Sequence, residues 1–201
     1  MLKKTVAGSA VFLAICFGAL LALGALFAQD KGKGGAPKAP AGPGLTLTSP
    51  DLVDGGVIPD KFTMKAGKDV VQPKLEWTNV PPGVVSFALL FHDPDAAPGK
   101  KIEDVTHWMV FNIPGTATSL AAGVSMEPKL ADGTIQIKGT RQVGYMGPPP
   151  GAAGPYHHYT FELFALDTKL DLGPDATRAD VMKAMDGHVI AKGVLEGRFH
   201  Q

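Results

Sequence analysis

The stretch Phe91-His92-Asp93-Pro94-Asp95 is the point around which we expect the fold to be organised, because it ends an apolar run that begins at Ser86 with two carboxylates beside a proline. Two further stretches, Thr106-His107-Trp108 and Tyr156-His157-His158-Tyr159, place imidazole and phenol groups at the start of other apolar runs. Short apolar runs of this kind are typical of β-strands. We therefore predict that the three stretches meet at one edge and form a small polar site.

Short apolar or alternating runs, separated by Gly, Pro, Asn and Asp, continue from Leu45 to Thr168. This pattern predicts a mostly β fold, an antiparallel β-sandwich of the Greek-key type, rather than alternating βα units. The expected strands are residues 45–48, 74–77, 86–92, 106–113, 134–138, 158–166 and 194–199.

One short helix is expected near the C-terminus. The segment Thr177-Arg-Ala-Asp180 resembles a capping box, with Asp at the position where Glu is usual. Val181, Met182 and Met185 follow at helical spacing, and Gly187 would end the helix.

Alternation of side chains along a strand assigns the polar groups to faces. It places Asp93 with Phe87, Leu89 and Phe91. It places His107 with Met109, Phe111 and Ile113, and it places His157 and Tyr159 with Phe161 and Leu163. Each polar group thus ends an apolar face, at the rim of the core, whereas His92 and His158 are expected to point the other way.

The N-terminal segment has the order of charge and hydrophobicity of an export signal. Lys3 and Lys4 precede an uncharged, largely apolar run, residues 5–28. We expect residues 1–28 to be either a signal peptide cleaved after Ala28 or an uncleaved membrane anchor, since the run is long enough to span a bilayer. In both cases the rest of the chain would lie outside the cytosol, so the protein would be periplasmic, secreted or anchored in the inner membrane.

Residues 29–44, rich in Gly, Pro and Lys, are expected to form a flexible linker, and residues 45–201 a single domain. Cys16, the only cysteine, lies in the signal segment, so the domain must be stable without disulfides. From Leu45 onward the chain carries 14 basic and 18 acidic residues, a net charge of −4. This mild acidity argues against a nucleic-acid partner and against binding of the domain itself to anionic membranes.

Several motifs, in order, carry a resemblance to a known family. They are Pro73-x-Leu75-x-Trp77 with Val80-Pro81, Ser86-Phe87-Ala88-Leu89, Asp93-Pro94-Asp95-Ala96, His107-Trp108-x-Val110-x-Asn112-Ile113-Pro114, Gly144-Tyr145-x-Gly147-Pro148 and His157-His158-Tyr159-x-Phe161. With these motifs the chain resembles the phosphatidylethanolamine-binding protein family, in its bacterial Raf-kinase-inhibitor-like branch. The resemblance covers the chain from about Leu45 to its C-terminus.

The resemblance implies a β-sandwich with a C-terminal helix and a small cavity that accepts phosphate or a phospholipid headgroup. It implies no cofactor. Carried over by position, the ligand-binding residues are Asp93, Asp95, His107, Gly147, Pro148, His157 and Tyr159, with the loop 147–150 as a wall.

None of these predicted site residues is Lys or Arg, so histidine would have to supply positive charge to an anion. On that basis we expect phosphate binding to weaken above about pH 7, as imidazolium loses its proton.

Two other functions compete with simple anion binding. Two histidines and an aspartate could hold a metal for hydrolysis, but the sequence has no His-Glu-x-x-His, Gly-x-Ser-x-Gly or phosphate-binding glycine loop, so we do not expect an enzyme. Family members are also linked to inhibition of kinases or proteases. For an exported domain, a protein partner would be an exported protease, inhibited through surface loops.

Overall fold

The computed structural model describes residues 44–150 and 155–200. The predicted signal or anchor segment and all but Gly44 of the predicted linker lie outside this part of the chain. No helix within the described part has the length and the apolar character needed to cross a membrane.

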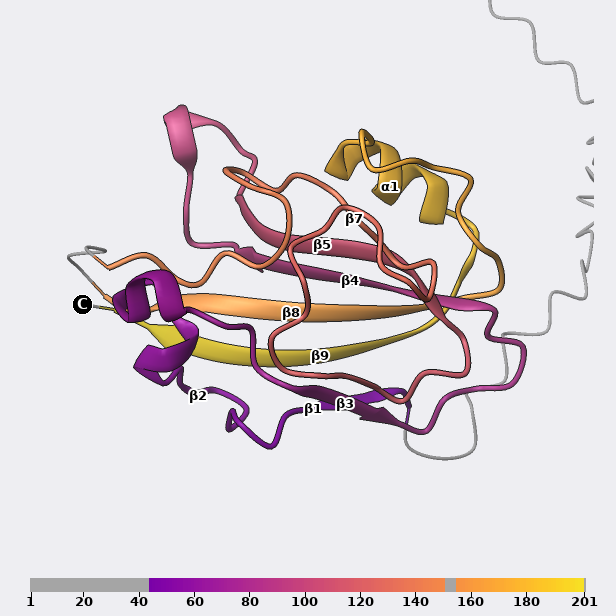
Figure 1. Ribbon diagram of the computed structural model, residues 1–201, viewed down its shortest axis with the longest axis horizontal. Helices are drawn as coiled ribbons and strands as arrows, with labels where there is room; N and C mark the ends of the chain where they lie inside the picture. The colour runs from indigo at the N-terminus through magenta and orange to yellow at the C-terminus, as the bar shows by residue number, and fades with distance from the viewer. Residues whose placement is uncertain (1–43, 151–154, 201) are drawn as a thin grey trace, which may run out of the picture. The chain divides into compact units, whose positions relative to one another are not determined.

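The described residues form mostly strands, arranged in two sheets, with few helices, as the sequence predicted (Figure 1). A small sheet has the strand order β1-β3-β6, and a large sheet has the order β2-β9-β8-β4-β5-β7. The strands are β1 (Thr46–Thr48), β2 (Gly56–Val57), β3 (Leu75–Thr78), β4 (Ser86–Asp93), β5 (Val105–Pro114), β6 (Ser119–Leu120), β7 (Ile135–Gln136), β8 (His157–Leu166) and β9 (Val189–Phe199). The helices are η1 (Asp60–Phe62), η2 (Met64–Asp69) and η3 (Pro98–Lys100), all of the 3-10 type, and α1 (Arg178–Met185).

The sandwich departs from the predicted antiparallel arrangement at one edge, where β2 pairs with β9 in parallel. β2 and β6 were not predicted, because strands of two residues are too short to show an alternating pattern. The final strand begins at Val189 rather than at Val194.

The two faces of the large sheet are covered differently. On one face Leu47 and Trp77 of the small sheet pack with Phe87, Leu89 and Phe91 of β4. On the other face α1 packs Val181 and Met185 against alternate residues of β4, among them Ala88 and Leu90 (Figure 1). β4 is buried on both faces, which explains its nearly uninterrupted apolar sequence.

The capping box of the predicted helix is present. The Thr177 hydroxyl accepts a hydrogen bond from the Asp180 N–H, and the Asp180 carboxylate accepts one from the Thr177 N–H. The helix ends at Met185, and Gly187 has a φ of 82° just beyond it, the left-handed conformation common after helices.

Two extra residues interrupt the alternation of β5, so the predicted face assignment of this strand was wrong. Phe91 pairs with Trp108 and His92 with Thr106, which leaves His107 as an inserted residue. A second shift in the pairing of β5 with β4 lies near Asn112, whose φ is 58°. As a result His107 and its expected neighbour Ile113 are on the face of Phe91, whereas the other two expected neighbours, Met109 and Phe111, belong to the core cluster beneath α1.

Candidate functional site

The bulge in β5 places the His107 ring among aromatic side chains of the neighbouring strands. Its ring centroid lies 5.4 Å from that of Phe91 on β4 and 5.2 Å from that of Tyr159 on β8, with an edge-on geometry to Tyr159. Without the inserted residue, alternation would direct His107 to the opposite face of the sheet. The bulge therefore brings the predicted polar stretch Thr106-His107-Trp108 to the same place as the other two.

A buried aspartate, Asp93, pairs with a half-buried histidine, His157, where β4 ends and β8 begins. His157 Nδ1 lies 2.8 Å from Asp93 Oδ2, and the aspartate side chain is only 5% exposed. The other oxygen, Asp93 Oδ1, accepts hydrogen bonds from the N–H groups of Asp95 and Ala96, at 3.0 and 3.1 Å. These bonds fix the carboxylate, and the carboxylate in turn fixes the orientation of the His157 ring.

His107 is held in one tautomer by a backbone carbonyl. Its Nδ1 lies 2.8 Å from the Met146 carbonyl oxygen, which can only accept a hydrogen bond. Nδ1 must therefore carry a proton, and in the neutral ring Nε2 is an acceptor. Burial is the main cause that lowers the pKa of His107 below its ordinary value, and the positive charge of Arg141 adds to this effect.

Tyr159 is fully buried, and its hydroxyl lies near the Asp93 carboxylate but makes no hydrogen bond of good geometry with any described residue. Burial raises the pKa of Tyr159 well above its ordinary value, and the negative charge of Asp93 raises it further. The phenol is thus a neutral O–H donor at neutral pH. An unsatisfied buried hydroxyl costs free energy, so a ligand that accepts its hydrogen bond would be stabilised there.

A cavity of about 390 Å³ joins these groups, and Asp93, His107, His157 and Tyr159 all line it. Four of the seven predicted ligand-binding residues are therefore brought together. They come from three adjacent strands, β4, β5 and β8, whose ends meet at one edge of the large sheet.

Asp95 is not among the residues that line this cavity. Its Oδ2 lies 2.8 Å from Nδ1 of His158, and both side chains are exposed, by 43% and 45%. The hydrogen bond from the His158 backbone N–H is the main cause that lowers the pKa of Asp95. The two neighbouring aspartates thus form similar histidine pairs in different places, one inside the cavity and one outside.

The proline loop 147–150 lines the cavity as expected, but through Pro149 and Pro150 and not through Gly147 and Pro148, which were expected to bind the ligand. Gly147 and Pro148 are buried and do not line the cavity. The Pro148 carbonyl accepts a hydrogen bond from the Met64 N–H, and a Cβ on Gly147 would lie 2.6 Å from the Phe62 carbonyl oxygen. They anchor the loop, and the next two residues, Pro149 and Pro150, line the cavity.

Arg141 also lines the cavity, which corrects the expectation that the site has no fixed positive charge. It forms none of the ion pairs found within residues 44–150 and 155–200. No motif of the sequence marked this residue. The one available signal was its position four residues before Tyr145, in the segment that leads into the proline loop.

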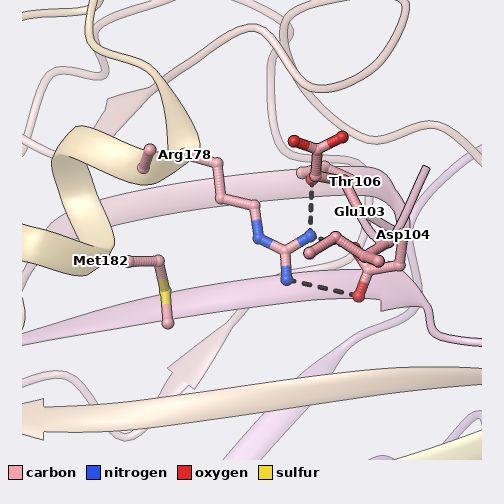
Figure 2. Close-up of a pocket in the computed structure, with 7 residues that line it drawn as sticks. Glu103, Asp104, Thr106, Arg178 and Met182 are labelled. Atoms are coloured by element: carbon pink, nitrogen blue, oxygen red, sulfur yellow. Dashed lines mark hydrogen bonds and ion pairs between the residues drawn. The ribbon is translucent and has the colours of Figure 1, made fainter. Parts of the chain in front are cut away.

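A second cavity, of about 420 Å³, lies between α1 and the residues that lead into β5 (Figure 2). Figure 2 shows the Arg178 guanidinium directed at Asp104 and Thr106, which it contacts through an ion pair and a hydrogen bond. The Arg178 charge is therefore already paired within the fold. This arrangement tethers α1 to the large sheet, whereas the cavity around Tyr159 contains a donor without a partner.

No group of three or more metal-ligating side chains with the spacing for an ion occurs among the described residues.

Comparison with known proteins places the whole cavity within a region of recognised similarity. The sequence profile of a family described as phosphatidylethanolamine-binding protein matches residues 48–200. The chain is 40% identical over 158 residues to a UPF0098 protein of Methanothermobacter thermautotrophicus, across 78% of this chain and 99% of that protein. It is 35% identical over 161 residues to the Mycobacterium tuberculosis protein named "Putative lipoprotein LppC", across 80% of this chain and 75% of that protein.

The fold is also similar to that of a crystal structure of E. coli YbcL, described as a new member of the mammalian PEBP family. The TM-score is 0.67 at 28% sequence identity, and the match covers 79% of this chain and 99% of that one. Both sheets and all the cavity residues named above lie within the matched residues 48–200, apart from the first two residues of β1.

Proposed function

The chain belongs to the phosphatidylethanolamine-binding protein family, and from this premise we propose that its cavity binds a small anion that carries a phosphate group. The ligand would be inorganic phosphate, a phosphorylated small molecule or the headgroup of a phospholipid. The single observation that carries the proposal is the buried Tyr159 hydroxyl, a donor without a partner among the described residues, in a cavity that it shares with two histidines.

The chemistry of the cavity suits an oxyanion better than an apolar ligand. Tyr159 offers a neutral O–H, and Arg141 offers a permanent charge at the same cavity. His157, held by Asp93, presents its second ring nitrogen as a further polar group. A phosphate group has several acceptor oxygens and can satisfy these groups at once.

The volume of about 390 Å³ admits a headgroup-sized ligand but lies at the small end of the range for drug-sized molecules. A phospholipid would therefore enter with its headgroup alone, and its acyl chains would stay outside. This limit supports phosphate, phosphoethanolamine and similar polar ligands.

Isothermal titration calorimetry on the Tyr159→Phe variant tests the proposal. This change removes one oxygen and keeps the buried ring, so the fold should be retained. The wild-type protein should bind inorganic phosphate or phosphoethanolamine, and Tyr159→Phe should bind about tenfold more weakly, since one buried hydrogen bond to a charged group is lost.

Tyr156→Phe is the matched control, because Tyr156 is exposed and does not line the cavity. Its affinity should equal that of the wild type. Failure of the wild-type protein to bind either ligand, or equal affinity of the two phenylalanine variants, would contradict the proposal. Binding to vesicles that contain phosphatidylethanolamine, with no binding of free phosphate, would assign the cavity to a lipid headgroup instead.

We further propose that the protein acts outside the cytosol. Lys3 and Lys4 followed by the apolar run 5–28 support this location, as does similarity to the Mycobacterium tuberculosis relative that is named as a lipoprotein. Cell fractionation with mass spectrometry of the N-terminus tests it. A chain that begins at Gln29 would indicate a cleaved signal, and an intact N-terminus in the membrane fraction would indicate an anchor. An intact chain in the cytosolic fraction would overturn the proposed location.

A further inference from the structure

We propose that the cavity selects phosphate groups that retain a proton, namely inorganic phosphate and protonated phosphomonoesters, over sulfate, with His107 accepting that proton's hydrogen bond and Arg141 anchoring the charge. This inference rests on the proposed function and adds ligand selectivity to it. It also assigns a role to Arg141, which no family motif quoted above contains.

His107 can accept a hydrogen bond from a ligand in the cavity. Its Nδ1 donates to the Met146 carbonyl, and no hydrogen bond to Nε2 is found within the described part of the chain. The ring lines the cavity. A neutral imidazole in this tautomer can accept a hydrogen bond at Nε2 but cannot donate one there. A ligand with only acceptor oxygens would leave Nε2 facing another acceptor.

The charges around His107 keep it in this neutral form. Burial opposes its protonation, and the nearby positive groups Arg141 and His92 oppose it too. The Met146 carbonyl and the negative charge of Asp93 favour protonation, but the pKa is lowered in total. These groups come from β4 and the segment 139–146, and β8 adds the neutral phenol of Tyr159 beside the ring. His107 is therefore an acceptor at neutral pH, not a source of positive charge.

The backbone turn that carries Arg141 is held rigidly by hydrogen bonds. The flanking residues Lys138 and Val143 form a bridge, and the Gly139 N–H donates to the Gln142 carbonyl at 2.8 Å. This tight turn is fastened to β5 at Thr106, next to His107. The Thr106 N–H donates to the Thr140 hydroxyl at 3.0 Å, and the Thr140 N–H donates to the Thr106 carbonyl at 2.9 Å.

Gly139 permits this close approach of the turn to Thr106, since a Cβ at residue 139 would lie 2.7 Å from the Thr106 carbonyl oxygen. The backbone that carries Arg141 is thus fixed relative to His107 before any ligand binds. Because this backbone is fixed, binding of an oxyanion by the exposed Arg141 side chain costs less entropy than binding by a charge on a free loop.

Together these residues define the pattern that a ligand must match. Arg141 and Tyr159 donate, and His107 Nε2 accepts. Hydrogen phosphate has both acceptor oxygens and a P–OH donor, and so does a phosphomonoester below its second pKa of about 6. Sulfate lacks the donor, so it would leave Nε2 of His107 facing an acceptor oxygen, which disfavours its binding.

Competition calorimetry on the full-length protein at about pH 6, at constant ionic strength, tests the selectivity. Inorganic phosphate should bind about tenfold or more tightly than sulfate. In protein labelled with 15N-histidine, phosphate should shift the His107 Nε2 resonance and sulfate should not. Equal affinity for phosphate and sulfate would overturn the selectivity and leave the proposed anion site standing, whereas no binding of any of these anions would overturn the proposed function itself.

Arg141→Gln should weaken phosphate binding about tenfold. Lys138→Gln is the matched control, because Lys138 flanks the same turn, is exposed and does not line the cavity. It removes the same charge and should leave phosphate affinity unchanged. Equal losses in the two variants would reduce Arg141 to a contribution to net charge and would overturn its assignment as an anchor.

Discussion

The two aspartate–histidine pairs at the end of β4 allow a controlled test of the geometry of the site. Asp93 with His157 and Asp95 with His158 have the same separation of 2.8 Å between carboxylate oxygen and Nδ1. They differ in environment, because the Asp93 side chain is 5% exposed and that of Asp95 is 43% exposed. Substitution of each aspartate by asparagine keeps the side-chain shape and removes the charge.

The expected magnitudes follow from burial. Asp93→Asn replaces a buried, charge-assisted hydrogen bond by a neutral contact, and bonds to charged groups contribute about 1.5–3 kcal/mol. We expect the free energy of unfolding to fall by about 2 kcal/mol. Asp95→Asn alters an exposed pair, which is screened by water, so the loss should be below about 1 kcal/mol.

Urea denaturation at neutral pH measures both changes. The dependence of unfolding free energy on urea concentration should be the same in both variants, so that the shift of the midpoint reports stability. A double-mutant cycle with His157→Gln then isolates the coupling between Asp93 and His157. Equal losses for Asp93→Asn and Asp95→Asn would refute the conclusion that burial strengthens the hydrogen bond of Asp93 relative to that of Asp95.

Three further predictions concern the core, the helix and the buried histidine. Phe91→Ala should lower the free energy of unfolding by about 3–5 kcal/mol, measured by urea denaturation, because Phe91 is fully buried and its ring stacks on Phe161 at 3.9 Å. Thr177→Ala should cost about 1 kcal/mol through loss of the N-cap of α1, whereas a loss near zero would contradict the capping role. The His107 imidazole should titrate below the ordinary value of 6.5, observed by NMR, since burial lowers its pKa. Because the unfolded chain then binds the proton more readily, His107 should make the protein less stable as pH falls below about 6.5; a His107 pKa at or above the ordinary value would contradict this.

Most of the fold follows from local patterns. The long runs that became β4, β5 and β8 are apolar, β-branched or aromatic, and turn residues bound them, so their existence could be predicted. The cap at Thr177 is equally local. The parallel pairing of β2 with β9 could not be predicted, because it joins residues far apart in the chain and involves only two residues of β2.

Side-chain alternation alone did not predict how the site residues are oriented. Alternation assigned His107 to the wrong face, since a single inserted residue reverses the face of everything beyond it and leaves no signature in hydrophobicity. That His107 belongs to the site was nevertheless predicted, from its place beside the other polar stretches.

Arg141 was missed because contacts of Thr140 with Thr106, which are 34 residues apart, bring it to the cavity. Asp95 was included because it was carried over from the family motif Asp93-Pro94-Asp95-Ala96, but the turn after Asp93 directs it to His158.

A crystal structure of the protein grown with inorganic phosphate tests the central claim most directly. We expect electron density for phosphate in the cavity, with one oxygen about 2.7 Å from the Tyr159 hydroxyl and another within hydrogen-bonding distance of the Arg141 guanidinium. Density for phosphate only at the outer surface, with the Tyr159 hydroxyl still without a partner, would contradict it.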